Sequence, residues 1–215
     1  MSNRTVIIAG ATGLVGKIIL EGLLADPAVT AVHSLGRKAP TIRHAKLTAH
    51  VVDFSVLPPL PPADELYLAL GTTIKVAGSQ AAFRAVDLDA NLAVASAALA
   101  CGVKRVGLVS AMGADSRSMV FYSRVKGDLE KALAAMPFEG LIIARPSILV
   151  GDREALGQPT RRGERLASSL SKVLGALIPS NYKPVDAAAV AGALLANVPS
   201  SPGRQILLSG EMRMR

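Results

Sequence analysis

Residues 5–16 read TVIIAGATGLVG, an apolar run followed by three glycines spaced three residues apart. The run Val6–Ala9 predicts a strand buried on both faces, because such strands lack polar alternation. An amphipathic stretch after it predicts a helix. Gly10 would permit the tight turn, Gly13 the approach of backbone to a pyrophosphate, and Gly16 close helix–strand packing. With the N–H groups of a helix start free, the stretch predicts a dinucleotide-binding unit.

Strand and helix patterns alternate over the first two thirds of the chain. Further strands are expected at Ala31–Leu35, Leu47–Val52, Glu65–Leu70, Arg105–Ser110 and Gly140–Arg145, and long helices at Gln80–Cys101 and Met119–Met136. This alternation predicts a single α/β domain over residues 1–215, with a Rossmann-type doubly wound parallel sheet.

The alternation fails from Pro146 to Pro184, where glycines and prolines surround one short helical pattern near Glu164–Ile178. We expect residues 146–184 to form an irregular insert at the carboxyl ends of the strands, where such folds bind ligands. It is interpreted as a small C-terminal substrate cap. A helix at Val185–Asn197 and a strand at Arg204–Leu208 are expected to complete the domain.

Composition narrows the function classes. Lys and Arg outnumber Asp and Glu by 24 to 16, and this excess favours anionic ligands, including phosphorylated cofactors. There is no Trp, and Phe and Tyr are few, so the stacking platforms of single-strand nucleic-acid binders are missing. No apolar run reaches about 18 residues, the length of a membrane span. No signal-peptide pattern begins the chain, and a cytoplasmic protein with no nucleic-acid or membrane partner is expected.

The residues that follow the second and third strands bear on the cofactor. An acidic residue at the end of the second strand would accept from the ribose of NAD, but Arg37 and Lys38 stand there. A guanidinium can grip a 2′-phosphate instead, which favours NADP. Asp53, after the third strand, has two open interpretations: an acceptor for the adenine amine, or a loop-start or helix-capping residue.

Ser110, Tyr122 and Lys126 form a second constellation. Tyr122 and Lys126 are four residues apart and share one face of the predicted helix. A nearby ammonium favours the phenolate, so the phenol can exchange a proton with a reacting oxygen. Ser110, at the carboxyl end of a strand, is placed to hydrogen-bond that oxygen. These three are the candidate catalytic residues.

Together, the glycine motif, Ser110 and the Tyr122-x-x-x-Lys126 spacing resemble short-chain dehydrogenase/reductases of the extended or atypical kind. Leu70-Gly-Thr-Thr73, the segment from Ala77 to Asp87, and Arg145-Pro-Ser147 with Gly151-Asp-Arg153 narrow the resemblance to the Tat-interacting-protein-like subgroup. The resemblance implies a Rossmann fold with NADPH bound and Tyr122 as proton donor or acceptor. It also implies that Lys126 tunes Tyr122 and binds the nicotinamide ribose, and that Ser110 contacts the substrate oxygen.

Some of the predicted cofactor contacts follow from the residues and motifs themselves. The resemblance adds Gly71, Thr72, Pro146 and Ser147. The full predicted set is Gly10, Thr12, Gly13, Leu14, Val15, Gly16, Arg37, Lys38, Asp53, Leu70, Gly71, Thr72, Tyr122, Lys126, Pro146 and Ser147.

Other polar residues are given structural roles. The three histidines are dispersed without a ligand-like spacing, so no metal site is expected. Asp87, Asp89 and Asn91 are expected to cap, solvate or pack the helix that contains them. The Ala-rich face of Ala81–Ala100 would pack either on its own sheet or against a second copy, so a homodimer stays open.

The sequence therefore predicts an NADPH-dependent oxidoreductase that acts on a small carbonyl or alcohol substrate. The alternative is a non-catalytic NADPH-binding redox sensor or regulatory protein, which would need the same cofactor residues. The intact set of Ser110, Tyr122 and Lys126 favours the enzyme.

Overall fold

The computed structural model describes residues 3–150 and 179–213. Seven parallel strands form one sheet in the order β3-β2-β1-β4-β5-β6-β9. They are β1 (Arg4–Ala9), β2 (Val29–Gly36), β3 (Leu47–Val51), β4 (Glu65–Leu68), β5 (Arg105–Val109), β6 (Gly140–Arg145) and β9 (Gly203–Leu208). The order reverses direction between β1 and β4, the switch point of a doubly wound fold. The predicted Rossmann-type α/β fold is confirmed.

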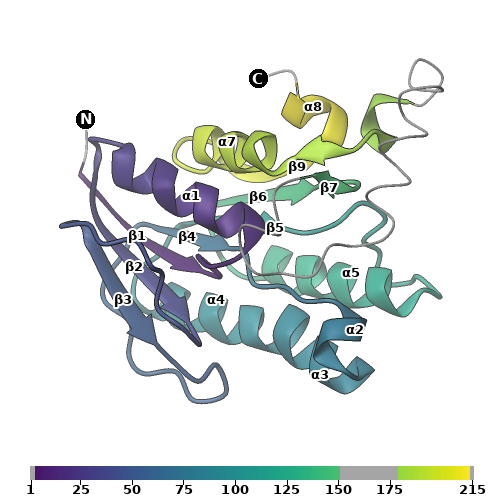
Figure 1. The fold of residues 1–215 in the computed structure, drawn as a ribbon, viewed down its shortest axis with the longest axis horizontal. Coiled ribbons are helices and arrows are strands. Elements are labelled where there is room, and N and C mark those ends of the chain that lie inside the picture. Colours follow the sequence, from purple (N-terminus) through teal and green to yellow (C-terminus); the bar gives the residue numbers. More distant parts are fainter. Residues whose placement is uncertain (1–2, 151–178, 214–215) are drawn as a thin grey trace.

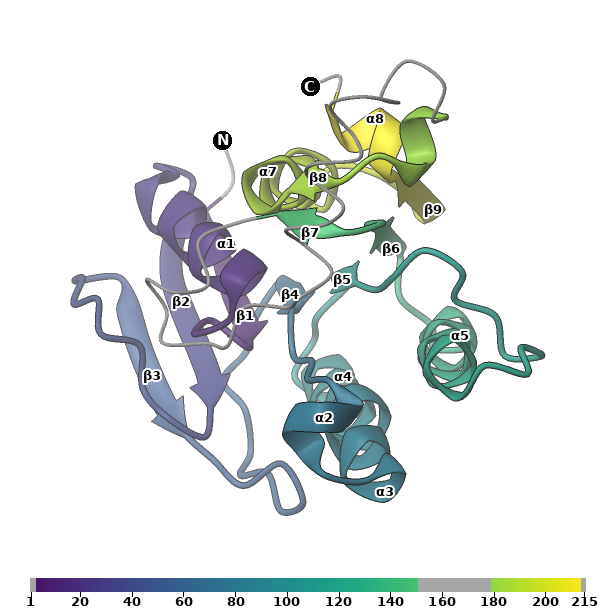
Figure 2. The ribbon, with the colours of Figure 1, turned by 45° about the vertical axis from the view of Figure 1, so that its right-hand side comes forward.

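Helices cover both faces of the sheet, with α1 (Leu14–Ala25) and α7 (Ala187–Asn197) on one face (Figure 1). On the other face lie α4 (Asn91–Ala100) and α5 (Phe121–Ala134), and Figure 2 shows the two layers apart. The shorter helices are α2 (Ile74–Ala77), α3 (Gln80–Arg84), the π-helix η1 (Ala85–Ala90), the 3₁₀ turn η2 (Ser180–Tyr182) and α8 (Ser209–Arg213). Among the helices of the described residues, none is both long and apolar enough to cross a bilayer.

β1 lies inside the sheet, and this position accounts for its apolar sequence. Val6 and Ile8 belong to the core beneath α1 and α7, whereas Ile7 and Ala9 belong to the core beneath α4 and α5. All four side chains are fully buried. Because both faces are covered, the strand carries no polar alternation.

The predicted helix Gln80–Cys101 is not a single α-helix. Its middle, Ala85–Ala90, is a π-helix that joins α3 to α4. A π-helix uses i→i+5 hydrogen bonds and is frequent at functional sites. The wider turn changes the direction in which the side chains of this segment point, and Asp87 lies within it.

The insert after β6 begins and ends at one place in the fold. β7 (Leu149–Val150) pairs in parallel with β8 (Val185–Asp186), and Asp186 then caps α7 by accepting from the N–H of Ala188. The helix expected near Glu164–Ile178 lies outside the described residues. The interpretation of residues 146–184 as a substrate cap therefore stays a prediction.

Candidate functional site

The glycine turn between β1 and α1 has the geometry that its spacing predicts. Gly10 has a φ of +93°, and a Cβ on it would lie 2.5 Å from the carbonyl group of Ala69. A Cβ on Gly16 would lie 2.1 Å from the carbonyl oxygen of Gly10. A Cβ on Gly13 would meet nothing nearer than 3.4 Å. Gly10 and Gly16 are therefore required by the fold, whereas the fold itself leaves room at Gly13.

This difference tests whether the turn fits a dinucleotide. The N-terminus of α1 begins after Gly13 with no side-chain cap and no acidic residue in its first turn. Its N–H groups and the positive end of the helix dipole are thus left for an anion. The protein has room for a Cβ at Gly13, so the fold does not require a glycine there. A glycine at this position does fit a bound pyrophosphate, which would approach the backbone closely. Thr12, Leu14 and Val15 belong to the same turn and first helical turn.

Arg37, Lys38 and Asp53 follow the ends of β2 and β3, which the hydrogen bond from Val52 N–H to the Gly36 carbonyl holds together. Arg37 and Lys38 are exposed. Within the described residues, neither forms an ion pair or a hydrogen bond, so both are free to meet an anion. Asp53 accepts from the N–H and the hydroxyl of Ser55 through one oxygen, and these bonds lower the pKa of Asp53. Asp53 thus forms a turn at the start of the loop after β3, where no helix follows, and its second oxygen accepts no hydrogen bond within the described residues.

Tyr122 and Lys126 lie on α5 as predicted. The ring of Tyr122 packs against the ring of Phe83, with 5.5 Å between the two ring centroids. The Tyr122 hydroxyl forms no hydrogen bond within the described part of the chain. The Lys126 side chain is 5% exposed, and its Nζ lies 2.7 Å from Oδ1 of Asp87. The ammonium group of Lys126 is therefore held in an ion pair with the carboxylate of Asp87.

Asp87 joins two predicted parts of the site. Its second oxygen, Oδ2, accepts from the backbone N–H of Thr72 at 2.8 Å, and the residue is 1% exposed. A Cβ on Gly71 would lie 3.4 Å from Asp87 Oδ1 and 3.8 Å from Lys126 Nζ. Asp87 thus links the loop after β4, which includes Leu70, Gly71 and Thr72, to the lysine of α5.

The sequence led us to expect that Asp87 caps, solvates or packs its helix, and the structure shows it buried, paired with Lys126 and accepting from Thr72 N–H. Asp89 is exposed, as expected for a residue on a helix surface. The side-chain amide of Asn91 donates to backbone carbonyls, including that of Val86. The sequence did not distinguish Asp87 from Asp89, because both stand in the same short segment, Ala85–Ala90.

The hydroxyl of Ser110 contacts an ion pair between the buried Glu130 and the partly buried Arg145. Its hydroxyl donates to Oε1 of Glu130 at 2.5 Å, and Glu130 is 2% exposed. Arg145 donates from Nε to both oxygens of Glu130, at 3.0 and 3.2 Å, and from Nη2 to Oε2 at 2.6 Å. Sequence reasoning missed Glu130, although it lies four residues after Lys126 on α5.

Pro146 and Ser147 follow β6. The Pro146 carbonyl accepts from the N–H of Met112, and the Ser147 hydroxyl donates to the carbonyl of Lys183 at 2.5 Å. The Ser147 N–H donates to the hydroxyl of Ser209 at 2.8 Å. These bonds tie β6 to the residues before β8 and to α8. A contact of Pro146 and Ser147 with a cofactor stays a prediction.

The structure also brings together two of the histidines that appear dispersed in the sequence. His33 Nδ1 on β2 lies 3.1 Å from His50 Nε2 on β3. Burial and the neighbouring charge of His50 lower the pKa of His33. No group of three or more His, Cys, Asp or Glu side chains suited to a metal occurs within the described residues.

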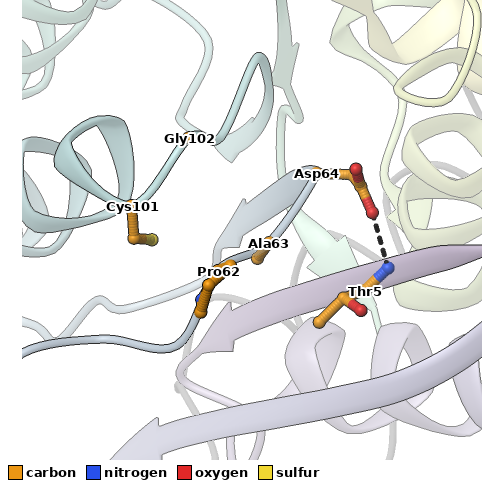
Figure 3. Close-up of a pocket in the computed structure, with 6 residues that line it drawn as sticks. All are labelled: Thr5, Pro62, Ala63, Asp64, Cys101 and Gly102. Atoms are coloured by element: carbon orange, nitrogen blue, oxygen red, sulfur yellow. Dashed lines mark hydrogen bonds between the residues drawn. The ribbon is translucent and has the colours of Figure 1, made fainter.

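A cavity of about 380 Å³ lies at the other end of the sheet (Figure 3). It is lined by residues before or at the start of β1 and β4 and just after α4: Thr5, Pro62, Ala63, Asp64, Cys101 and Gly102. Asp64 accepts from the N–H of Thr5 across its edge. Because it opens at the amino ends of the strands, it is separate from the glycine turn at their carboxyl ends.

Residues 10–156 match the family described as NAD(P)H-binding. The chain belongs to this family. Among the relatives of this chain, the protein HTATIP2 of Rattus norvegicus is 35% identical over 221 residues, covering 100% of this chain and 86% of the relative. The mitochondrial protein fmp52 of Emericella nidulans is 37% identical over 182 residues, covering 80% and 78%. The resemblance to the Tat-interacting-protein-like subgroup is confirmed.

Solved structures share the overall fold of this chain. A UDP-N-acetylglucosamine 4-epimerase from Methanobrevibacter ruminantium M1, in complex with UDP-N-acetylmuramic acid, has a TM-score of 0.73 at 15% identity and covers 97% of this chain and 77% of that one. MoeE5, in complex with UDP-glucose and NAD, has a TM-score of 0.69 at 17% identity, with 94% and 75% covered. At such identities, these likenesses establish the fold alone.

The relatives overturn one expectation drawn from the sequence. Relatives of this chain from Emericella nidulans, Coccidioides immitis and Candida glabrata are named as mitochondrial proteins. The expectation of a cytoplasmic location was wrong by this comparison. It rested on the missing signal-peptide pattern, and a secretory signal says nothing about other compartments.

Proposed function

We propose that this protein is an NADPH-dependent oxidoreductase of the short-chain dehydrogenase/reductase type, acting on a small carbonyl or alcohol substrate. One observation carries the proposal: Tyr122 and Lys126 share a face of α5, and Asp87 fixes the ammonium of Lys126 against the loop of Gly71 and Thr72. A buried ammonium at this position, beside a loop that follows a central strand, suits the chemistry of proton transfer at the carboxyl edge of the sheet.

The cofactor would lie across the switch point between β1 and β4. The first turn of α1, with Gly13 and the backbone N–H groups after it, would bind the pyrophosphate. Arg37 and Lys38, both without a partner among the described residues, would bind the 2′-phosphate of NADP. This preference for NADP over NAD is part of the proposal, as are the contacts assigned to Asp53, Pro146 and Ser147.

The residues of α5 would handle the proton. In the reducing direction, the Tyr122 hydroxyl donates its proton to the carbonyl oxygen as the carbon gains a hydride, and a phenolate remains. Bound NADPH supplies that hydride. The ammonium of Lys126 stabilises the phenolate, and Asp87 keeps the ammonium in place. Oxidation of the alcohol runs the same steps backwards, with Tyr122 taking the proton.

The test is NADPH consumption with a panel of aldehydes, ketones and quinones. Tyr122→Phe removes the hydroxyl, so the rate should fall by at least about 100-fold, the usual contribution of a general acid. Ser123→Ala, the neighbouring position on α5, is the control and should keep most of the rate. Binding of NADPH, measured by its fluorescence, should be close to that of the wild type in both variants.

Two results would count against an enzyme. A Tyr122→Phe rate equal to that of the wild type would remove Tyr122 from the chemistry. No turnover of any panel member, with NADPH still bound, would favour the regulatory NADPH-binding protein instead.

A further inference from the structure

We infer that a cavity beside α5 binds the phosphate group of a small anionic ligand. The cavity has a volume of about 410 Å³, within the range of about 300–1,000 Å³ that small-molecule sites occupy. The charged residues that line it are Asp115, Arg117, Glu130, Lys131, Arg145 and Arg204. It lies on the α5 face of the sheet, whereas α1 covers the other face, so it is separate from the anion site at the N-terminus of α1. The inference does not rest on the proposed function.

The sheet places two guanidinium groups on the side of this cavity. Leu141 and Ile143 of β6 belong to the core beneath α4 and α5. Because side chains alternate between the two faces of a strand, Arg145, two residues after Ile143, lies on the same face. Arg204 of β9 is the register partner of Leu141 and therefore shares that face too. Both arginines line the cavity.

The charges that line the cavity favour an anion. Four cationic side chains stand there with two carboxylates, so an excess of two positive charges remains. A phosphate monoester carries about −1.5 to −2 charges near pH 7 and offers strong acceptor oxygens. Lys131 and Arg204 are exposed, and their side chains form neither an ion pair nor a hydrogen bond within the described residues. Both are therefore available to a ligand.

Arg145 keeps donors for a second anion although it already holds Glu130. A guanidinium has five N–H donors. Those of Nε and one of Nη2 are directed at Glu130, at 3.0 and 2.6 Å. Nη1 forms no hydrogen bond with a described residue, so its two N–H groups and the second one of Nη2 remain for a phosphate, which arginine binds at two points. The side chain of Arg145 is 23% exposed, and a ligand in the cavity can therefore contact it.

The loop before α5 supplies a fixed wall and one opposing charge. A Cβ on Gly127 would lie 2.1 Å from the backbone nitrogen of Ser116, so the loop packs directly on α5 and is in place before a ligand binds. Asp115 in this loop opposes an anion, but it accepts from the backbone N–H of Arg117 at 2.8 Å and lies 3.5 Å from Nε of the same residue. The hydrogen bond from Arg117, together with the charges of Arg117 and Arg145, lowers the pKa of Asp115.

The experiment titrates inorganic phosphate into the full-length protein and follows the backbone amide shifts by NMR. A titration with sodium chloride to the same ionic strength is the comparison. We expect saturable shifts at residues 114–117 and 127–134, with a dissociation constant below about 10 mM, because several charged hydrogen bonds form. Shifts at residues 10–16 report binding at the glycine turn instead, so one spectrum separates the two sites.

Variants of exposed residues test the assigned contacts without disturbing the fold. Lys131→Gln and Arg204→Gln should each raise the dissociation constant of phosphate about tenfold, the loss of one charged hydrogen bond. Asp115→Asn removes the opposing charge and keeps an oxygen for the N–H of Arg117, so it should lower the constant about threefold. Lys104→Gln is the control, because Lys104 is exposed and pairs with Glu139 outside the cavity; its effect should stay below about twofold.

Three results would overturn the inference: shifts confined to residues 10–16, the same shifts with chloride as with phosphate, or losses in Lys131→Gln and Arg204→Gln no larger than in Lys104→Gln. A second titration with glycerol 3-phosphate identifies the source of the phosphate group. Tighter binding than that of inorganic phosphate assigns the cavity to phosphate monoesters, and equal or weaker binding assigns it to the free ion. None of these readouts involves turnover, so the outcome for the proposed function is decided separately.

Discussion

The carboxylate of Asp87 lies 2.7 Å from the ammonium of Lys126, with 1% and 5% of the two side chains exposed. One residue comes from the π-helix before α4 and the other from α5, so the pair joins two elements that the sequence separates widely. The same carboxylate accepts from Thr72 N–H, which extends the connection to the loop after β4.

Removing the charge of Asp87 should destabilise the protein. In Asp87→Asn, the buried ammonium of Lys126 loses its counter-charge, so the free energy of unfolding should fall by about 3 kcal/mol. Urea denaturation measures this change. Asp89→Asn is the control, because Asp89 is exposed and lies 3.9 Å from Arg84; its effect should stay within about 0.5 kcal/mol. Equal effects at the two positions would contradict the buried-pair interpretation.

Substitutions at Gly16 and Gly13 should affect different properties: the first should lower stability, and the second should lower NADPH affinity. Gly16→Ala places a Cβ 2.1 Å from the backbone oxygen of Gly10, so it should cost more than about 2 kcal/mol of stability. Gly13→Ala has room in the protein and should leave stability within about 1 kcal/mol. Its Cβ would meet a pyrophosphate, so NADPH affinity should fall at least about tenfold, by fluorescence titration. An unchanged affinity would refute the assigned role of Gly13.

Arg37→Ala should discriminate between the two nicotinamide cofactors. A charged hydrogen bond to phosphate contributes about 1.5–3 kcal/mol, so NADPH affinity should fall roughly 10- to 100-fold while NADH affinity stays nearly unchanged. Calorimetric titration of both cofactors gives the ratio. The exposed Arg43, which lies beyond the end of β2, serves as the control through Arg43→Ala. Equal losses for NADPH and NADH would count against NADP preference.

The His33–His50 pair should make stability depend on pH. The pKa of folded His33 lies below its ordinary value, because burial and the charge of His50 both oppose protonation. As the pH falls through about 6.5, the unfolded chain therefore takes up the proton first, and the free energy of unfolding decreases until the folded ring protonates as well. His33→Gln should lessen this loss, measured by urea denaturation at about pH 7 and pH 5. His44→Gln, on an exposed ring, should not.

Most of the fold could be predicted because its signals are local. The strand Gly140–Arg145 has the predicted bounds, and β1 with its glycine turn follows from apolar residues and spacing alone. The π-helix Ala85–Ala90 could not be predicted, because one wider turn barely disturbs an apolar pattern read over a long helix. The pairing of β7 with β8 was missed since two residues are too few to show a period.

The candidate site divides in the same way. Tyr122 and Lys126 are recognisable from a spacing of four, but the burial of Asp87 depends on a lysine in another element. The partner of Ser110 is likewise set by packing, because Glu130 could have faced solvent from α5. Tertiary contacts, rather than residue type, decide which carboxylates belong to the site.

The pairing of β7 with β8 has a consequence for how the two ends of the insert are held. Leu149 pairs with Val185 and Val150 with Asp186 in a small second sheet, so the chain that leaves β6 and the chain that enters α7 are joined at one place. The hydrogen bond from Ser147 to Lys183 secures the same junction. Because the entropy of closing a loop grows only slowly with its length, this junction fixes where the two ends lie without fixing how many residues join them.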